Sequence, residues 1–123
     1  MLPRQHRLRG GRDFEAVYAA GRRTSLPLLG CHVLRDPGES DAPSRFAFVT
    51  SRKVGKACVR NKVRRRLRAA VRRRLSLLVG GCRVVLVARP AAADVSWPEL
   101  AAAVDNVLLR AGLLPSTEPA APK

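Results

Sequence analysis

Cations dominate the chemistry that this sequence can perform. Twelve residues between positions 52 and 74 are Lys or Arg, and no acidic residue occurs from position 42 to 93. Guanidinium and ammonium groups bind phosphate, and the planar guanidinium can do so through two parallel hydrogen bonds. We therefore expect the counter-charge for this half of the chain to come from an outside polyanion.

A long helix from residue 56 to about residue 78, closed by Gly80 and Gly81, is predicted to carry most of these cations. At about 100 degrees per residue, one face collects apolar residues that can pack on a sheet, namely Val59, Val63, Leu67, Ala70 and Val71. The opposite face collects Asn61, Arg65, Arg68 and Arg72, with Lys62, Arg64, Arg66 and Arg73 beside them. Like charges one turn apart repel, and no Glu is interspersed to relieve them. This pattern favours a binding face over a solvated one.

The start of this helix is also basic, although a helix N-terminus already carries positive potential. Arg52 and Lys53 precede Gly55, and Lys56 follows it, with no Asp or Glu nearby. Backbone N–H groups at such an end can bind a phosphate. We expect an anion of the partner to lie here.

Groups suited to hydrolysis are scattered along the chain. Phosphodiester hydrolysis by a protein needs metal-binding carboxylates or a positioned acid and base. The carboxylates are dispersed, and neither His6 nor His32 has a predicted acidic partner. Cys31, Cys58 and Cys82 match no metal or haem spacing and are expected to be buried or half-buried thiols. We predict no catalytic residue and no metal site in the chain.

The size and charge of the chain narrow the classes of protein to consider. Its 123 residues fit one domain, and 24 Lys and Arg against 9 Asp and Glu give a formal net charge of +15. No stretch is long and apolar enough to span a bilayer, and the N-terminus lacks the apolar run of a secretion signal. We expect a cytoplasmic protein that binds nucleic acid, with no membrane partner, no small-molecule substrate and no cofactor of its own.

Apolar spacing predicts the remaining helices. A short helix over residues 13–20 carries Phe14, Val17 and Tyr18 at one-turn spacing, and Gly21 is expected to end it in a left-handed conformation. A last helix over about residues 98–111 begins with a capping box of Ser96 and Glu99 and stops at Gly112.

Three strands are predicted, at residues 28–35, 45–51 and 83–89. The first two are expected to form an antiparallel pair joined by a loop of turn formers. The third is a continuous apolar run, which is typical of a strand that is buried on both faces. This order predicts an α+β fold, an α/β sandwich with helices against one mixed sheet. We assign residues 1–12 to a flexible basic arm, 13–114 to a single domain and 115–123 to a disordered tail.

Residues 51–68, with the sequence SRKVGKACVRNKVRRRLR, resemble the signature helix of the bacterial ribonuclease P protein. The resemblance extends from about residue 8 to 114 and includes Asp13-Phe14, Val17-Tyr18, Gly21 and the strand at 83–90. It implies a sheet of about four strands with three helices in the order αβββαβα. It also implies a left-handed crossover through the long basic helix, where base rates favour a right-handed one.

The resemblance also implies partners and sites. The protein would bind the catalytic RNA of ribonuclease P and precursor tRNA, while the RNA of the holoenzyme uses Mg²⁺ to cleave off the 5′ leader. The resemblance implies that eleven residues bind the catalytic RNA, and we name them the basic surface: Arg52, Lys53, Lys56, Arg60, Asn61, Lys62, Arg64, Arg65, Arg66, Arg68 and Arg72. Within it, Arg60-Asn61-Lys62 matches the family's Arg-Asn-Arg centre, with a Lys that keeps the charge but lacks the planar fork. Phe14 and Tyr18 match the aromatic positions of the family's cleft for the single-stranded leader.

Other interpretations remain open from the residues alone. Phe14 and Tyr18 could be ordinary core residues. A ribosomal or other structural RNA-binding protein would share the charge and size, and a nucleoid protein could place the basic helix in a DNA groove. The joint presence of the signature helix and the aromatic first helix favours the ribonuclease P protein.

Overall fold

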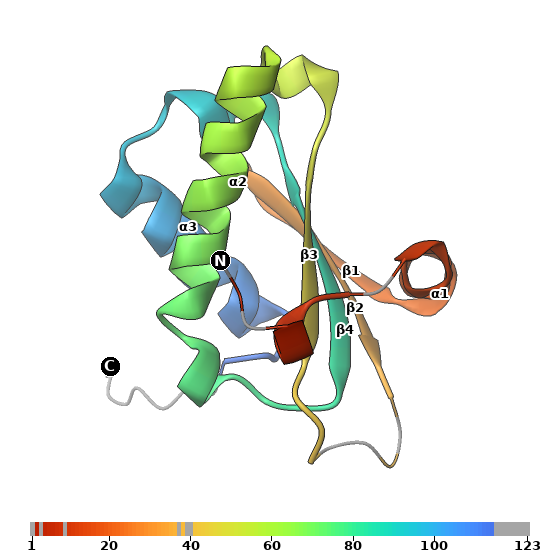
Figure 1. The fold of residues 1–123 in the computed structure, drawn as a ribbon. Helices are drawn as coiled ribbons and strands as arrows, with labels where there is room; N and C mark the ends of the chain where they lie inside the picture. The colour runs from red at the N-terminus through yellow and green to blue at the C-terminus, as the bar shows by residue number, and fades with distance from the viewer. Residues whose placement is uncertain (1, 3, 9, 37, 39–40, 115–123) are drawn as a thin grey trace.

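The computed structural model describes residues 2, 4–8, 10–36, 38 and 41–114 (Figure 1). In this part of the chain the helices are α1 (Gly10–Ala20), α2 (Ala57–Arg72) and α3 (Trp97–Arg110). The strands are β1 (Arg22–Ser25), β2 (Leu29–Arg35), β3 (Arg45–Thr50) and β4 (Cys82–Ala88). Short 3-10 turns are η1 (Arg4–His6), η2 (Arg52–Val54), η3 (Leu75–Leu77) and η4 (Pro90–Asp94). The predicted α+β class and the order αβββαβα are confirmed, whereas the tail predicted at 115–123 lies outside the described residues.

The strands form one mixed sheet in the order β1-β2-β4-β3. β4 pairs antiparallel with β2 and parallel with β3, so the antiparallel pairing predicted between the strands at 28–35 and 45–51 is wrong. The physical reason lies in burial. β4 is the most apolar strand, and its central residues Val84, Val85 and Leu86 are fully buried, so it takes the middle of the sheet.

The connection from β3 through α2 to β4 is left-handed, as the family resemblance implies. In Figure 1 both strands run upward, β3 lies in front of β4, and α2 lies to their left. The structure therefore places α2 along the β3 edge of the sheet, and this helix carries most of the basic surface.

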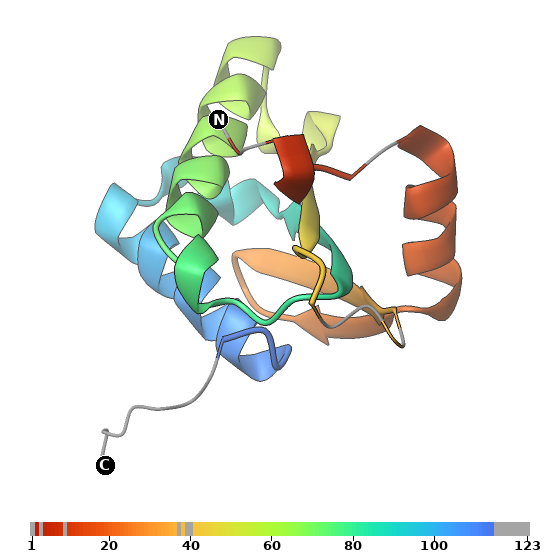
Figure 2. The same ribbon diagram turned by 60° about the horizontal axis from the view of Figure 1, so that its bottom comes forward.

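Helices cover both faces of the sheet. Figure 2 shows α1 on one side and α2 and α3 on the other. The larger core lies beneath α2 and α3 and joins side chains from both helices and the sheet, among them Leu67, Val71, Val84, Leu86, Leu100, Val104 and Leu108. Beneath α1, Val17 is fully buried, as is Val85 of β4, which lies outside the larger core. The first helix is thus anchored by few residues and leaves room for a cleft beside it.

The flexible arm predicted for residues 1–12 needs correction in its described part. Leu2 is buried in the larger core, and Leu8 donates its backbone N–H to the carbonyl oxygen of Phe46 at 3.0 Å. Arg7 and Phe46 form a parallel bridge, which extends the sheet beyond β3. An edge strand offers unpaired backbone groups, and this segment occupies some of them. Helix α1 also starts inside the predicted arm, at Gly10.

The ends of α3 agree with the sequence-based prediction, whereas the C-terminal ends of α1 and α2 differ from it. Ser96 and Glu99 form the predicted capping box of α3, and Gly112 at φ +78° ends that helix. Gly21 is not left-handed. It is required because a Cβ there would lie 2.3 Å from the carbonyl oxygen of Val17. Helix α2 ends at Arg72, earlier than predicted, because a turn and η3 follow it.

Candidate nucleic-acid interface

The apolar and cationic faces predicted for α2 are present. Val63, Leu67, Ala70 and Val71 are buried against the sheet and α3, and Val59 is half-buried. Asn61, Lys62, Arg65 and Arg72 are exposed, whereas Arg60, Arg64, Arg66 and Arg68 are half-buried. The cations therefore spread around the open side of the helix and down both of its flanks, wider than a single stripe.

Some cations of this half of the chain have internal partners, contrary to the prediction that all counter-charge comes from outside. Asp105 of α3 accepts from Arg73 at 2.9 Å and from Arg74 at 2.8 Å. Burial alone would raise the pKa of the Asp105 carboxyl, but hydrogen bonds and charge from these two arginines lower it below its ordinary value. Arg83 of β4 pairs with Asp13 and Asp36.

The basic surface itself remains without such partners. In the described part of the chain, none of its ten cations lies within 4.0 Å of a carboxylate oxygen. Arg73 and Arg74 lie outside this surface, and Asp105, the carboxylate that they share, lies beside the C-terminal end of α2. Self-repulsion among the ten charges is therefore uncompensated, and an anionic partner would relieve it.

Two arginines of the basic surface are oriented by hydrogen bonds within the protein, and a third is not. Arg64 donates to the hydroxyl of Thr50 at 2.8 Å and also to the side-chain oxygen of Asn61. Arg66 donates to the backbone carbonyl of Val95 at 3.1 Å. The Nε of Arg60 is buried and has no hydrogen-bond partner among the described residues, which leaves a donor unsatisfied at the predicted centre of RNA contact.

The segment before α2 presents further cations beside the helix N-terminus. Arg52, Lys53 and Lys56 are exposed, and the first turn of α2 has neither an acidic residue nor a side-chain cap. Gly55 has φ +151°, and a Cβ there would lie 3.0 Å from the side chain of Val59. Only glycine fits this approach, so the backbone of η2 passes close over the first turn of α2.

Phe14 and Tyr18 lie on α1 and face the sheet, but they are not enclosed core residues. Their rings stack at a centroid distance of 6.5 Å, and Tyr18 is 47% exposed. His32 of β2 contacts Tyr18 edge to face at 4.7 Å. Partial burial, reinforced by the charge of Arg23, lowers the pKa of His32, which favours the neutral ring.

A hollow of about 290 Å³ continues this aromatic group toward α2. Phe14 of α1, Phe48 of β3 and Arg68 of α2 are among the residues that line it. We name Phe14, Tyr18, His32 and this hollow the aromatic cleft. It brings the two predicted sites together, because Arg68 belongs to the basic surface.

Sequence reasoning missed two members of the cleft. In the sequence His32 has no predicted acidic partner, which says nothing of its value as a stacking ring, and Phe48 fits the apolar run of a strand. Successive side chains of β2 point to opposite faces of the sheet, and Cys31 and Val33 are buried in the larger core. His32 therefore points to the other face. That alternation was the available signal, since it puts His32 on the face that α1 covers.

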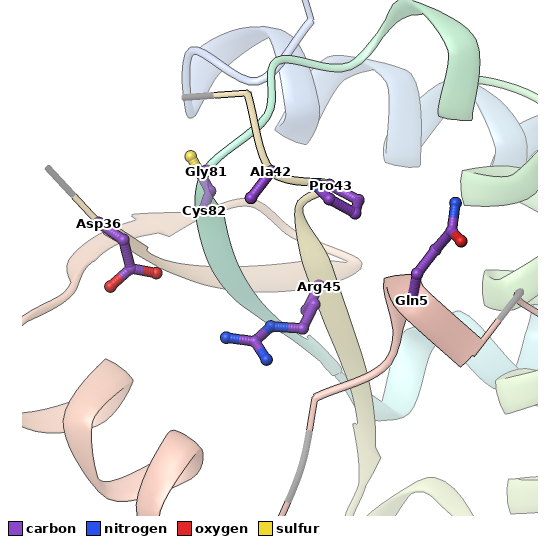
Figure 3. A pocket seen from close by; sticks show the side chains of 7 residues that line it. All are labelled: Gln5, Asp36, Ala42, Pro43, Arg45, Gly81 and Cys82. Atoms are coloured by element: carbon purple, nitrogen blue, oxygen red, sulfur yellow. The ribbon is translucent and has the colours of Figure 1, made fainter. Parts of the chain in front are cut away.

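Two other hollows among the described residues contain polar side chains that already have hydrogen-bond partners in the protein. One contains His6, Asp41 and Ser44, but the Ser44 hydroxyl donates to the carbonyl oxygen of Val79 at 2.6 Å and accepts from the Cys82 N–H. Figure 3 shows another, lined by Asp36 among others, and this carboxylate is bound by Arg83.

The described residues contain neither a cluster of metal ligands nor a helix that could span a membrane. No three His, Cys, Asp or Glu side chains come together there to hold a metal ion. No helix in that part of the chain has the length and apolar character to cross a membrane. Cys31 and Cys82 are buried, as expected. Cys58 is exposed on α2, so the expectation of a buried or half-buried thiol is wrong for this residue.

Comparison with known proteins agrees with this arrangement. The sequence model of the family described as Ribonuclease P matches residues 2–112. The ribonuclease P protein component of Streptomyces avermitilis is 45% identical over 116 residues, covering 89% of this chain and 94% of that protein. The solved RNase P protein of Thermotoga maritima is 27% identical, with a TM-score of 0.75 over 85% of this chain and 96% of its own. That of Staphylococcus aureus has a TM-score of 0.80 at 21% identity, over 89% and 98%, and supports the fold alone. The chain belongs to the ribonuclease P protein family.

Proposed function

We propose that this chain is the RNA-binding subunit of a ribonuclease P, which removes the 5′ leader from precursor tRNA. The observation that carries the proposal is the basic surface, whose ten cations have no carboxylate partner in the described residues. Such a surface gains by contact with phosphates, because binding releases the counterions that RNA condenses.

The catalytic RNA is the proposed partner of α2 and of the segment before it. Arg60, Asn61 and Lys62 form the centre of this contact, and Arg52, Lys53 and Lys56 extend it to the helix N-terminus. Arg64 and Arg66 are already fixed by protein hydrogen bonds, so less side-chain freedom is lost when RNA binds. The unpartnered Nε of Arg60 is a donor that an RNA oxygen could satisfy after a small movement of the side chain.

Precursor tRNA is proposed to place its single-stranded leader in the aromatic cleft. Ring faces stack on unpaired bases with about 1 to 3 kcal/mol per base and little sequence preference, which suits leaders of varied sequence. Tyr18 is sufficiently exposed for such contact. Arg68 borders the same hollow as Phe14 and can hold the phosphates of a strand that leaves the cleft toward α2.

The hydrolysis itself is assigned to the RNA, which would supply the Mg²⁺ sites that polarise the phosphate and activate water. The protein's residues bind, screen and orient: the cations of the basic surface reduce repulsion between the two RNAs, and the cleft holds the leader. A cytoplasmic location is part of this proposal, because precursor tRNA is processed there in bacteria.

The test adds the purified chain to a ribonuclease P RNA at a Mg²⁺ concentration too low for the RNA alone and measures cleavage of precursor tRNA. We expect cleavage to appear only when both components are present and the same 5′ end of mature tRNA to be produced. The RNA alone at high Mg²⁺ serves as the control for correct cleavage. Failure of the chain to restore cleavage, or cleavage by the chain without RNA, would refute the proposal.

A further inference from the structure

Trp97 lies beside the basic surface in a place that the proposed function does not use. It begins α3, and together with Lys62, Arg65, Arg66 and Ala69 of α2 it lines a hollow of about 320 Å³. The side chain is 37% exposed. Since α1 and α3 lie on opposite sides of the sheet, this hollow is on the far flank of α2 from the aromatic cleft (Figures 1 and 2).

Packing does not account for the position of this ring. The larger core under α3 contains Leu100, Val104, Val107 and Leu108, and Trp97 is not part of it. An indole that stays 37% exposed gives up part of the stabilisation that full burial would bring. Trp and Arg are both enriched among the residues that carry most of the binding energy at interfaces.

The backbone around Trp97 is nevertheless well defined. Ser96 and Glu99 close the capping box on either side of it, so the carboxylate of Glu99 is engaged there. Arg66 ties the preceding segment to α2 through the carbonyl oxygen of Val95 at 3.1 Å. The ring is therefore presented on a fixed support, with the short side chain of Ala69 leaving space in front of it.

Charge and shape together select the occupant. Three cations line the hollow, and none of the described carboxylates does. An occupant must then present a flat apolar face to the indole and an anion to the cations, which describes an unpaired nucleotide. We propose that an unpaired nucleotide of the RNA bound along α2 stacks its base on Trp97 and places its phosphate between Lys62 and Arg65. This inference rests on the proposed function, since it assumes that RNA lies on α2.

The chain provides its own probe for this site. Trp97 is the only tryptophan among the 123 residues, so intrinsic indole fluorescence reports on this position alone. Ribonuclease P RNA is titrated into the full chain while emission is followed, and binding is measured in parallel by retention of labelled RNA on a filter. We expect emission to be quenched in step with binding, because a stacked base quenches indole fluorescence. RNA that binds without any change in emission would overturn the inference and leave the proposed function intact, whereas absence of binding would count against the proposed function.

Two further comparisons sharpen the test. A single-stranded oligonucleotide is expected to quench Trp97, and a fully paired RNA of the same length is expected to bind without quenching; equal quenching by both would overturn the claim of an unpaired base. Trp97→Leu should weaken binding of ribonuclease P RNA by about 5- to 160-fold, the loss of one stacked base. Leu109→Ala, which removes another exposed apolar side chain of α3, should bind as the unchanged protein does. Equal affinity of the Trp97 variant and the unchanged protein would contradict the proposal.

Discussion

Salt concentration should control RNA binding steeply, and the structure sets the expected size of the effect. Ten cations of the basic surface have no carboxylate partner in the described residues, and about six to ten phosphates are a reasonable number for them to neutralise. Each neutralised phosphate contributes about 0.7 to 0.9 to the slope of log affinity against log salt. The total slope is then about −4 to −9. Raising salt threefold should weaken binding by about 10²- to 10⁴-fold.

Two double variants, one within α2 and one just after its end, distinguish the effect of unpaired cations from a general effect of net charge. Arg65→Gln with Arg68→Gln removes two unpaired cations and should make the slope shallower by about 1.4 to 1.8. Arg73→Gln with Arg74→Gln removes the same charge, but these side chains are held by Asp105 and should change the slope little.

The assay is filter retention of labelled ribonuclease P RNA across a series of monovalent salt concentrations at constant Mg²⁺. Circular dichroism of each variant checks that it is folded under these conditions. A flat response of the unchanged protein would refute the reasoning. So would equal loss of slope in both double variants, because the internal pairing would then make no difference.

Other predictions concern the cleft, an ion pair and a helix end. Phe14→Ala with Tyr18→Ala should weaken binding of precursor tRNA by about 1 kcal/mol or more and leave mature tRNA unaffected, as measured in the holoenzyme; equal losses for both would remove the leader assignment. Asp105→Asn should lower the free energy of unfolding by about 1 to 2 kcal/mol near neutral pH, in urea titrations. Because the folded-state pKa of Asp105 lies below its ordinary value of 3.8, this difference should be complete above that value and vanish as pH falls through the lowered one. Gly21→Ala should lower the urea midpoint, because its Cβ would meet the carbonyl oxygen of Val17 at 2.3 Å; an unchanged midpoint would show that the turn relaxes freely.

Local sequence rules account well for the helices of this protein. The two faces of α2 follow from helical spacing alone, and the capping box at Ser96 and the stop at Gly112 follow from residue type and position. These features depend on residues within a few positions of one another. That is why they were predictable without knowledge of the fold.

Sheet pairing depends on distant residues and was less predictable. β1 has the sequence Arg-Arg-Thr-Ser, which lacks the apolar alternation of a strand, and it forms because β2 offers it an edge. The insertion of β4 between β2 and β3 follows from competition for the most buried position. No local pattern in the sequence indicates the left-handed crossover. Its handedness was expected only because the sequence resembles the family.

In the candidate site, too, features set by neighbouring residues were predictable and contacts between distant residues were not. The cations of α2 could be read from sequence, but not that Asp105 lies beside Arg73 and Arg74, because the pairing crosses from one helix to another. Burial on one sheet face brings His32 to Tyr18, and the end of η4 brings Trp97 to α2. Contacts of this kind require the three-dimensional arrangement.

The central claim is that RNA lies on the exposed side of α2, and Cys58 allows a direct measurement. It is the exposed thiol on that helix, whereas Cys31 and Cys82 are buried, and burial raises the pKa of the Cys31 thiol to about 12. A photoreactive reagent attached to Cys58 should crosslink to ribonuclease P RNA in the assembled holoenzyme. A control variant combines Cys58→Ser with Asn106→Cys, which moves the thiol to an exposed position of α3. The same reagent attached at position 106 should give little crosslinking. Crosslinks from position 106 and none from position 58 would contradict the account.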